Sequence, residues 1–380
     1  MAKRSDVSWI SGEGARRAKS AIAVVLSFAV LLGGAGFAGW KGYEWYVQWQ
    51  QRDDYKGDGE TDITIIIPAG AGWAKVADTL VVNDVIKDQT LFVPAALKLA
   101  DGPQPGQWHI KTHLPAATAA KVLVDPKNVD KVTFTIPEGL RLDQILTILS
   151  DKVGVSRADW DAAVAAAEKD PKTIGLNAAA GKNLEGFLFP ATYTVYPPVT
   201  SDATSILAQM ADKFNTVASS IDLTNKAKKL KLTAAQAVTI ASIIEAEVSN
   251  PEDQAKVARA ILNRVAADMP LGVESVFRYG RLVTDGVPYA DPITAASQED
   301  DTLPYNYYIK TGIPKFAIGN PGQAALEAAV NPADGDWLYW VTVNLDTGET
   351  GFAADEAGYA ALADQFHQWC ADNGNPTGCQ

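Results

Sequence analysis

The chain has 380 residues, with 45 acidic against 33 basic side chains and a formal net charge of −12. This balance argues against binding to nucleic acid, whose phosphates are neutralised by Lys and Arg. The three histidines are His109, His113 and His367. A Ser-His-Asp triad or a histidine-based zinc site is therefore excluded from the interval between residues 114 and 366. We expect chemistry based on carboxylates, amides, hydroxyls and tyrosines, with no metal or cofactor, and we expect His109 and His113 to lie on the surface.

Residues 21–40 form an apolar stretch without a charged side chain. A helix of this length spans about 30 Å, the thickness of a bilayer's hydrocarbon core. Residues 1–20 carry a net charge of +3, which places the N-terminus in the cytoplasm and the remainder, with a net charge of −15, outside it. We therefore predict a single-pass protein of the cell membrane, with a transmembrane helix at 21–40. The alternative is a cleaved signal peptide, in which Ala35 and Ala38 mimic a small-residue cleavage site.

A strand-turn-helix unit occurs twice in the sequence. After a polar linker at 41–62, residues 63–67 are β-branched and end at a Pro-Ala-Gly turn, and a helical pattern follows. The same order recurs 69 residues later, from Val132. We predict a small domain at 63–131 and a larger domain at 132–364, each opening with this unit. The predicted buried faces of the two helices are Trp73, Val76, Ala77 and Leu80, and Leu142, Ile145, Leu146 and Leu149.

The small βα module is similar to LysM-like units, which bind N-acetylglucosamine chains in cell-wall proteins. The alternative is a module that only separates the larger domain from the membrane. Trp73 and Trp108 fit either stacking on sugar rings or packing in the core. In the C-terminal tail, residues 365–380, Cys370 and Cys379 are expected to form a disulfide outside the cell, the alternative being two free thiols.

The larger domain combines helical and strand-like patterns, so we predict an α+β fold with a mixed α/β catalytic domain. Helices are expected at 159–169 and 204–214, and another from Thr233 onward. Beyond Leu271 the chain is rich in aromatic and turn residues, and a strand is expected at 337–343.

The segment from Thr233 carries the candidate chemistry. Thr233 and Gln236 form a capping-box pattern, and Pro251 predicts that the helix ends near Asn250. Residues 234–244 contain no charge, which indicates a buried helix. Glu245 follows this apolar stretch directly. Desolvation there predicts a raised pKa and a carboxyl that donates a proton near neutrality, as a general acid does.

Two expectations concern the neighbours of Glu245. Glu247, two residues further along the helix, is expected at its exposed end. The alternative role for Glu245 is an ion pair between the helix end and an arginine such as Arg264.

The order of several motifs resembles the YceG-like endolytic murein transglycosylases, the MltG family. The resemblance covers roughly residues 60–356. Its motifs are Leu184–Pro190 with Thr192-Tyr193, Ala241–Glu245 with Glu247, Asn263-Arg264, Tyr279-Gly280, Pro304-Tyr305-Asn306, and Gly312-Ile313-Pro314 with Ile318–Gly322. The chain departs from the family pattern at Ala191, Glu274-Ser275-Val276 and Glu356-Ala357.

The resemblance implies a membrane-anchored lyase that cleaves the β-1,4 bond between N-acetylmuramic acid and N-acetylglucosamine in nascent glycan strands. The muramyl C6 hydroxyl attacks its own C1 and leaves a 1,6-anhydro end, with Glu245 as acid and then base. The implied partners are peptidoglycan strands, the lipid bilayer and peptidoglycan synthases. The implied substrate-binding residues are Glu185, Tyr193, Asn263, Tyr305 and Asn306. Two alternatives stay open: a water-using muramidase with Glu185 or another carboxylate as partner, and a non-enzymatic wall-binding scaffold.

Overall fold

The computed structural model describes residues 39–43, 53–176, 183–198, 202–248, 250–376 and 379. The predicted cytoplasmic segment 1–20, and the predicted membrane helix 21–40 apart from its last two residues, lie outside these ranges. Residues 39–43 are helical and exposed. Within the ranges described, none of the helices combines the length and the apolar character needed to cross a bilayer.

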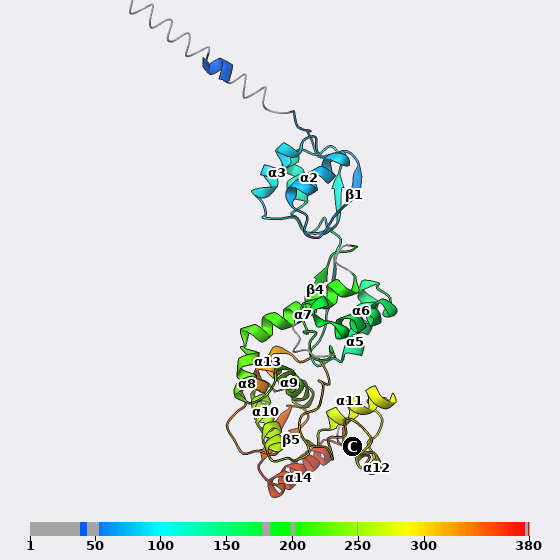
Figure 1. The fold of residues 1–380 in the computed structure, drawn as a ribbon, viewed down its shortest axis with the longest axis vertical. Coiled ribbons are helices and arrows are strands. Elements are labelled where there is room, and N and C mark those ends of the chain that lie inside the picture. The colour runs from blue at the N-terminus through cyan, green and yellow to red at the C-terminus, as the bar shows by residue number, and fades with distance from the viewer. Residues whose placement is uncertain are drawn as a thin grey trace, which may run out of the picture. The chain divides into compact units, whose positions relative to one another are not determined.

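The described chain divides into two compact units. Helices α2 (Trp73–Val82), α3 (Gln89–Leu97) and α4 (Ala116–Val122) belong to the smaller unit, and α3 packs against both of the others. Strands β1 (Asp62–Ile67) and β2 (Gly106–Lys111) form a two-stranded sheet (Figure 1). The predicted face of α2 is the one that is buried, because its apolar side chains recur at helical spacing.

The two tryptophans of the first strand-helix region are core residues. Trp73 and Trp108 are 4% and 0% exposed, and their indole N–H groups donate to the carbonyls of Ala100 and Gln104. The possibility that they stack on sugar rings is therefore wrong, since neither ring face reaches solvent. His109 is exposed and His113 is half-buried, and each contacts carboxylates.

The larger unit contains the second strand-helix pair. Strand β3 (Val132–Thr135) pairs antiparallel with β4 (Thr192–Val195), and α5 (Leu142–Val153) follows β3. Helices α6 (Arg157–Lys169) and α7 (Ala203–Ser220) confirm two predicted helices, although α7 is longer than predicted. A short 3-10 helix, η1 (Pro171–Ile174), packs between them.

Helix α9 is the central element for the candidate site. Its residues 237–244 are all buried, and α8, α10, α11 and α13 pack against it (Figure 1). The predicted capping box of Thr233 and Gln236 is confirmed, and Pro251 opens the next helix. The helices of this region are α8 (Leu223–Lys229), α9 (Ala234–Glu247), α10 (Pro251–Ala266), α11 (Glu274–Asp285), α12 (Ala295–Gln298) and α13 (Gln323–Val330).

The chain ends in a hairpin and a helix. Strands β5 (Tyr339–Asn344) and β6 (Glu349–Ala353) pair antiparallel, and α14 (Glu356–Asp372) packs against both. A disulfide joins Cys370 to Cys379, with the two Cα atoms 5.9 Å apart. Helices combined with two-stranded sheets confirm the predicted α+β class.

Candidate active site

Glu245 lies near the C-terminal end of α9, and its side chain is half-buried. Its Oε2 accepts a hydrogen bond from the backbone N–H of Gly322, at 3.0 Å. Burial raises the pKa of Glu245, the negative charge of Glu138 raises it further, and the bond from Gly322 opposes both effects. The rise has the predicted direction, so this carboxyl holds its proton closer to neutrality than an exposed glutamate does.

The alternative ion pair between Glu245 and Arg264 does not form. The Arg264 guanidinium donates from Nε to the carbonyl of Leu338, at 2.5 Å, and from Nη1 to the carbonyl of Leu271. It also lies about 5 Å from the ring centroids of Tyr339 and Trp340. Arg264 therefore holds the β5 region and does not pair with Glu245.

Asn320 connects three segments that are distant in sequence. It is fully buried, and its Oδ1 accepts from the backbone N–H groups of Gly186, at 3.1 Å, and Leu188, at 2.9 Å. Its Nδ2 donates to the carbonyl of Leu140, at 3.0 Å, and to Glu185 Oε1, at 2.9 Å. Every polar atom of this side chain is therefore engaged, and the turn at 318–322 is fixed against two other segments.

Three glycines allow the turn at 318–322 to approach the segment after β3. A Cβ on Gly319 would lie 2.7 Å from the backbone oxygen of Gly139, and one on Gly322 would lie 2.0 Å from Glu138 Oε1. Gly139 has a φ of +76°, and a Cβ there would lie 3.5 Å from Cγ of Glu245. The two segments and α9 therefore meet at Glu245, with Glu138 beside it.

Glu185 is a buried carboxyl whose oxygens are taken up by the fold. Its Oε1 accepts from the backbone N–H of Leu142, the first residue of α5, at 2.8 Å, and also from Asn320. The hydroxyl of Tyr279 donates to Oε2 at 3.3 Å. Burial raises the pKa of Glu185 to about 7, against the effect of these bonds. Glu185 therefore caps α5 and supports the turn of Asn320.

An aromatic cavity lies next to Tyr279. The ring of Tyr305 packs edge-on against that of Tyr279, with centroids 5.4 Å apart. Gly280 makes this possible, since a Cβ there would lie 2.2 Å from Cβ of Tyr305. The cavity has a volume of about 410 Å³ and offers ring faces suited to a pyranose. Its lining residues are Asn183, Tyr279, Val283, Pro304, Tyr305, Tyr307, Lys315 and Phe316.

The sequence position of Glu247 indicated an exposed helix end, and the structure does not place it at one. It is half-buried, and burial raises its pKa, with Glu274 adding to the rise. The expectation was wrong because α11 and β5 cover this end of α9. Glu247 instead lines a cavity of about 560 Å³. The other lining residues are Arg264, Met269, Pro270, Gly272, Glu274, Tyr308, Tyr339, Trp340 and Tyr359.

Comparison with known proteins agrees with this architecture. The sequence profile of the YceG-like family matches residues 65–365. The chain belongs to the YceG-like family. An endolytic murein transglycosylase of Bacillus subtilis is 30% identical over 296 residues, which cover 75% of this chain and 79% of the relative. Another from Streptococcus pneumoniae is 26% identical over 360 residues, covering 88% of this chain and 63% of the relative.

A solved structure has the same fold as this YceG-like chain. The crystal structure of a putative YceG-like protein from Listeria monocytogenes superimposes with a TM-score of 0.51 and 25% identity. The match covers 80% of this chain and all of the Listeria chain. The family relationship therefore holds at the level of sequence and of fold.

Tyr193 and Asn263 of this YceG-like chain lie in its framework. Tyr193 is buried on β4, and its hydroxyl donates to the carbonyl of Phe189. Asn263 donates from Nδ2 to the carbonyls of Gly335, at 3.2 Å, and Trp337, at 2.9 Å. Among the residues described, no hydrogen bond links either side chain to Glu245.

Asn306 holds the loop that presents Tyr305. It is 0% exposed, and its Nδ2 donates to the carbonyls of Gln298, at 2.7 Å, and Asp300, at 2.8 Å. Its Oδ1 accepts from the backbone N–H of Tyr308 at 3.2 Å. The structure thus brings Glu185 to the segments around Glu245, and places Tyr305 on the cavity beside Tyr279.

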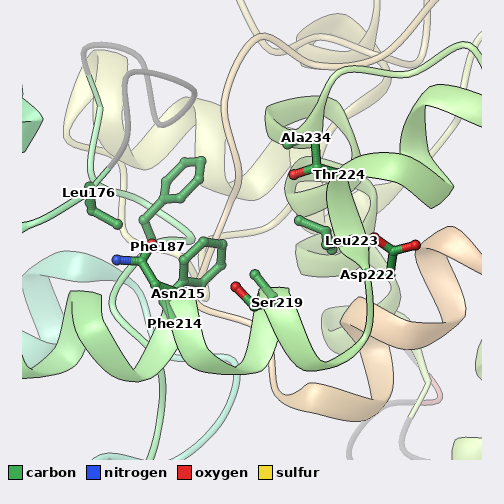
Figure 2. A pocket seen from close by; sticks show the side chains of 10 residues that line it. Leu176, Phe187, Phe214, Asn215, Ser219, Asp222, Leu223, Thr224 and Ala234 are labelled. Atoms are coloured by element: carbon green, nitrogen blue, oxygen red, sulfur yellow. The ribbon is translucent and has the colours of Figure 1, made fainter.

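Another cavity of the YceG-like chain lies beside α7 and α8 (Figure 2). It has a volume of about 310 Å³, and Phe187 and Phe214 line it together with Asp222. Asp222 accepts from Asn225, at 2.6 Å, so its carboxylate is engaged at the start of α8. Within the described ranges, no three His, Cys, Asp or Glu side chains gather as metal ligands.

Sequence reasoning missed two members of this YceG-like site. Glu138 was interpreted only as part of the turn Pro137-Glu138-Gly139, and Asn320 only as part of a motif without a role. The repeated β-run followed by Pro and Gly did contain a signal, because the second copy carries a glutamate where the first carries Ala69. That difference indicates that the second turn has a role beyond connecting a strand to a helix.

Proposed function

We propose that this YceG-like chain is an endolytic murein transglycosylase that cleaves the β-1,4 bond between N-acetylmuramic acid and N-acetylglucosamine. The observation that carries the proposal is the Glu245 carboxyl, whose pKa is raised by burial while Gly322 fixes its orientation. Relatives that bear this enzyme name support the same activity. A glutamic acid that remains protonated near neutrality is the group that glycosidic bond cleavage requires.

The reaction uses one carboxyl twice. Glu245 donates its proton to the bridging oxygen, the bond from that oxygen to C1 of the muramyl ring breaks, and the N-acetylglucosamine fragment leaves with a hydroxyl. The C6 hydroxyl of the same muramyl ring then attacks C1, and the Glu245 carboxylate accepts the hydroxyl proton. The new C6–O–C1 linkage is the 1,6-anhydro end, and Glu245 is protonated again without the use of water.

The five residues named from the family pattern are proposed to divide between substrate contact and support of the site. Tyr305 is best placed, because its ring lines a cavity large enough for a sugar. Glu185 and Asn306 act indirectly, since their polar atoms hold the turn of Asn320 and the loop of Tyr305. For Tyr193 and Asn263 we propose a framework role, because both bond to backbone carbonyls.

Membrane attachment and partners complete the proposal. The uncharged residues 21–40 and the net charge of +3 before them support a single-pass anchor with a cytoplasmic N-terminus. We further propose that the enzyme works on strands as peptidoglycan synthases produce them at the membrane. The burial of Trp73 and Trp108 favours a spacer role over glycan binding for the predicted small domain at 63–131.

The product profile tests this function. Purified sacculi are digested with wild type, with Glu245→Gln, and with Glu252→Gln, which removes an exposed glutamate from α10, and the muropeptides are separated by mass. We expect 1,6-anhydro ends from wild type and Glu252→Gln, and a loss of at least about 100-fold for Glu245→Gln. Unmodified reducing ends would identify a water-using muramidase. Unchanged strand length with all three proteins would identify a wall-binding scaffold.

Glu185 is the carboxylate named as a candidate partner in the muramidase alternative. Both oxygens of Glu185 accept hydrogen bonds from the fold, from Leu142, Asn320 and Tyr279. A nucleophile or a base for water needs a free lone pair directed at the sugar. These bonds favour the lyase over a hydrolase that depends on Glu185.

A further inference from the structure

Two carboxyl groups meet at one glycine. The backbone N–H of Gly322 donates to Glu245 Oε2 at 3.0 Å. A Cβ on the same glycine would lie 2.0 Å from Oε1 and 2.7 Å from Oε2 of Glu138. The Glu138 carboxyl therefore rests against Gly322 in the space that a side chain would occupy.

The fold fixes the backbone that carries Glu138. The N–H of Gly139 donates to the carbonyl of Asn320 at 2.8 Å, and the N–H of Asn320 donates to the carbonyl of Leu140 at 2.9 Å. These two bonds join the segment after β3 to the turn at 318–322. Glu138 is exposed, and these bonds hold the backbone that directly follows it.

Other charged groups lie on α9 and on the helices packed against it, and most of them bond elsewhere. Glu138 is the described residue whose charge acts on the carboxyl of Glu245. Arg141, two residues after Gly139, acts on Glu185 and lies over the ring of Tyr289. Charged groups bonded elsewhere on the helices around α9 are Asp253 with Lys256, Arg259, Arg264, Glu274 with Arg278, and Glu327. The lysines at the end of α8 are Lys226, Lys228 and Lys229, and Glu247 on α9 itself lies beside Glu274.

We propose that Glu138 is a second active-site carboxylate, whose negative charge keeps the proton on Glu245 before cleavage and stabilises positive charge on the sugar ring during cleavage. The first role follows from the position of the two carboxyl groups at Gly322, and the second rests on the proposed function. Glu138 forms no bond to the sugar and exchanges no proton. When the bond to C1 breaks, the ring gains oxocarbenium character, and a fixed carboxylate nearby lowers the energy of that state.

The proposal also explains a feature of the turn. Gly322 has a φ of −75°, which any residue adopts, so its backbone conformation does not require glycine. The space of a Cβ is instead occupied by the end of the Glu138 side chain, which an added Cβ would displace. The Pro-Glu-Gly turn after β3 and the Gly-Asn-Pro-Gly turn before α13 therefore pack against each other beside Glu245.

The test measures the titration of Glu245 and the activity separately, on the full chain. Side-chain carboxyl carbons of glutamate are followed by NMR from pH 3 to pH 9, and the Glu245 signal is the one missing from Glu245→Gln. In Glu138→Gln we expect the titration midpoint of Glu245 to fall by about 0.5 to 1 pH unit, because a like charge is removed. Glu138→Asp retains the charge and should return at least half of that shift.

The rate profile gives the second readout. Activity depends on protonated Glu245, so it falls as the pH rises through the pKa of that group. In Glu138→Gln this alkaline limb should move to lower pH by the same amount as the titration, and the maximal rate should fall about 10-fold. Glu252→Gln, which removes one charge from an exposed site, should change neither the limb nor the maximal rate.

The outcomes separate the two ideas. An unchanged Glu245 midpoint in Glu138→Gln, in a protein that melts at the wild-type temperature, overturns the inference. A shifted midpoint together with an unchanged maximal rate overturns the role during cleavage and leaves the role before it. A shifted midpoint in a chain without glycan scission would refute the proposed function while the pairing of Glu138 and Glu245 stands.

Discussion

Glu185 and Glu245 are both glutamates with a raised pKa, and their surroundings give them different tasks. Both oxygens of Glu185 accept bonds from the fold, so a change in its protonation changes the energy of the framework. Glu245 accepts a hydrogen bond at Oε2 from the backbone N–H of Gly322, and the negative charge of Glu138 also acts on it. A raised pKa alone therefore does not identify the acid, and the pattern of bonds distinguishes the two groups.

Glu185 should make stability depend on pH. Its pKa rises from 4.5 to about 7 on burial, so the folded state binds this proton more tightly than the unfolded state. The stability from this group is therefore complete below pH 4.5 and is lost as the pH rises through 7. At 1.36 kcal/mol for each pKa unit, the loss is about 3 kcal/mol. Glu185→Gln cannot ionise and keeps an oxygen for Leu142 and Asn320, so it should lack this loss.

Urea unfolding of wild type and Glu185→Gln at pH 4.5 and pH 8.5 measures the effect. The difference between the two proteins cancels the contribution of all other titrating groups, and it should change by about 3 kcal/mol in favour of the variant at the higher pH. A difference that stays constant between the two pH values would show that Glu185 does not change its proton affinity on folding.

At the scale of elements, the turn at 318–322 and the start of α13 are coupled to the turn after β3. Gly322→Ala should push the Glu138 carboxyl away, because the new Cβ needs its space. It also weakens the N-cap of α13, where alanine is poorer than glycine. Activity should fall by up to about 10-fold in the wild-type background, and by less than about 2-fold when Glu138 is already alanine.

A double-mutant cycle with Gly322→Ala and Glu138→Ala isolates this coupling. The cost at the N-cap is present in both backgrounds and cancels, so the remaining coupling in activity reports the displacement of the Glu138 carboxyl alone. Gly72→Ala, at the N-cap of α2 with a φ of −85° and open space around its Cβ, provides a matched glycine control away from the turn. Additive effects of the two substitutions would mean that the Glu138 side chain does not rest on Gly322.

Local signals in the sequence predicted the elements well, and they did not predict contacts between distant segments. The start of α9 at Thr233 follows from a capping box, which is a contact within one turn. The contact between Asn320 and Leu140 joins residues 180 positions apart, and no local pattern encodes it. Glu247 was misplaced for the same reason, since the covering elements α11 and β5 come later in the chain.

In the candidate site too, local sequence signals identify some residues, while the roles of others depend on contacts between distant segments. Glu245 was identifiable because an uncharged helix that ends in a carboxylate is a signal within one element. Asn263 and Asn306 were expected to face a glycan, and the fold uses their amides to bind loop carbonyls instead. Polar residues in a motif serve substrate or framework, and only their partners in space decide which.

At the scale of the whole chain, charge is distributed unevenly. Residues 1–20 carry a net charge of +3, and the residues after position 40 carry −15. The enzyme would thus present an acidic exterior to the wall and a basic segment to the anionic inner leaflet. In the proposed single-pass topology, this distribution would orient the anchor and hold the active site near the membrane surface.

Removal of residues 1–52 should release the protein from the membrane without loss of activity. The full chain is expected in the membrane pellet, resistant to a carbonate wash at pH 11, because a buried apolar helix is not displaced by salt or alkali. The shortened chain should remain in the supernatant and still form 1,6-anhydro ends on sacculi, since Glu138, Glu245 and Gly322 all lie in the larger unit. The same shortened chain with Glu245→Gln serves as the inactive control. If the full chain is instead processed to a mature protein that begins after Ala38 and appears in the soluble fraction, residues 1–38 are a cleaved signal peptide. The cytoplasmic segment would then have no role in holding the enzyme at the membrane.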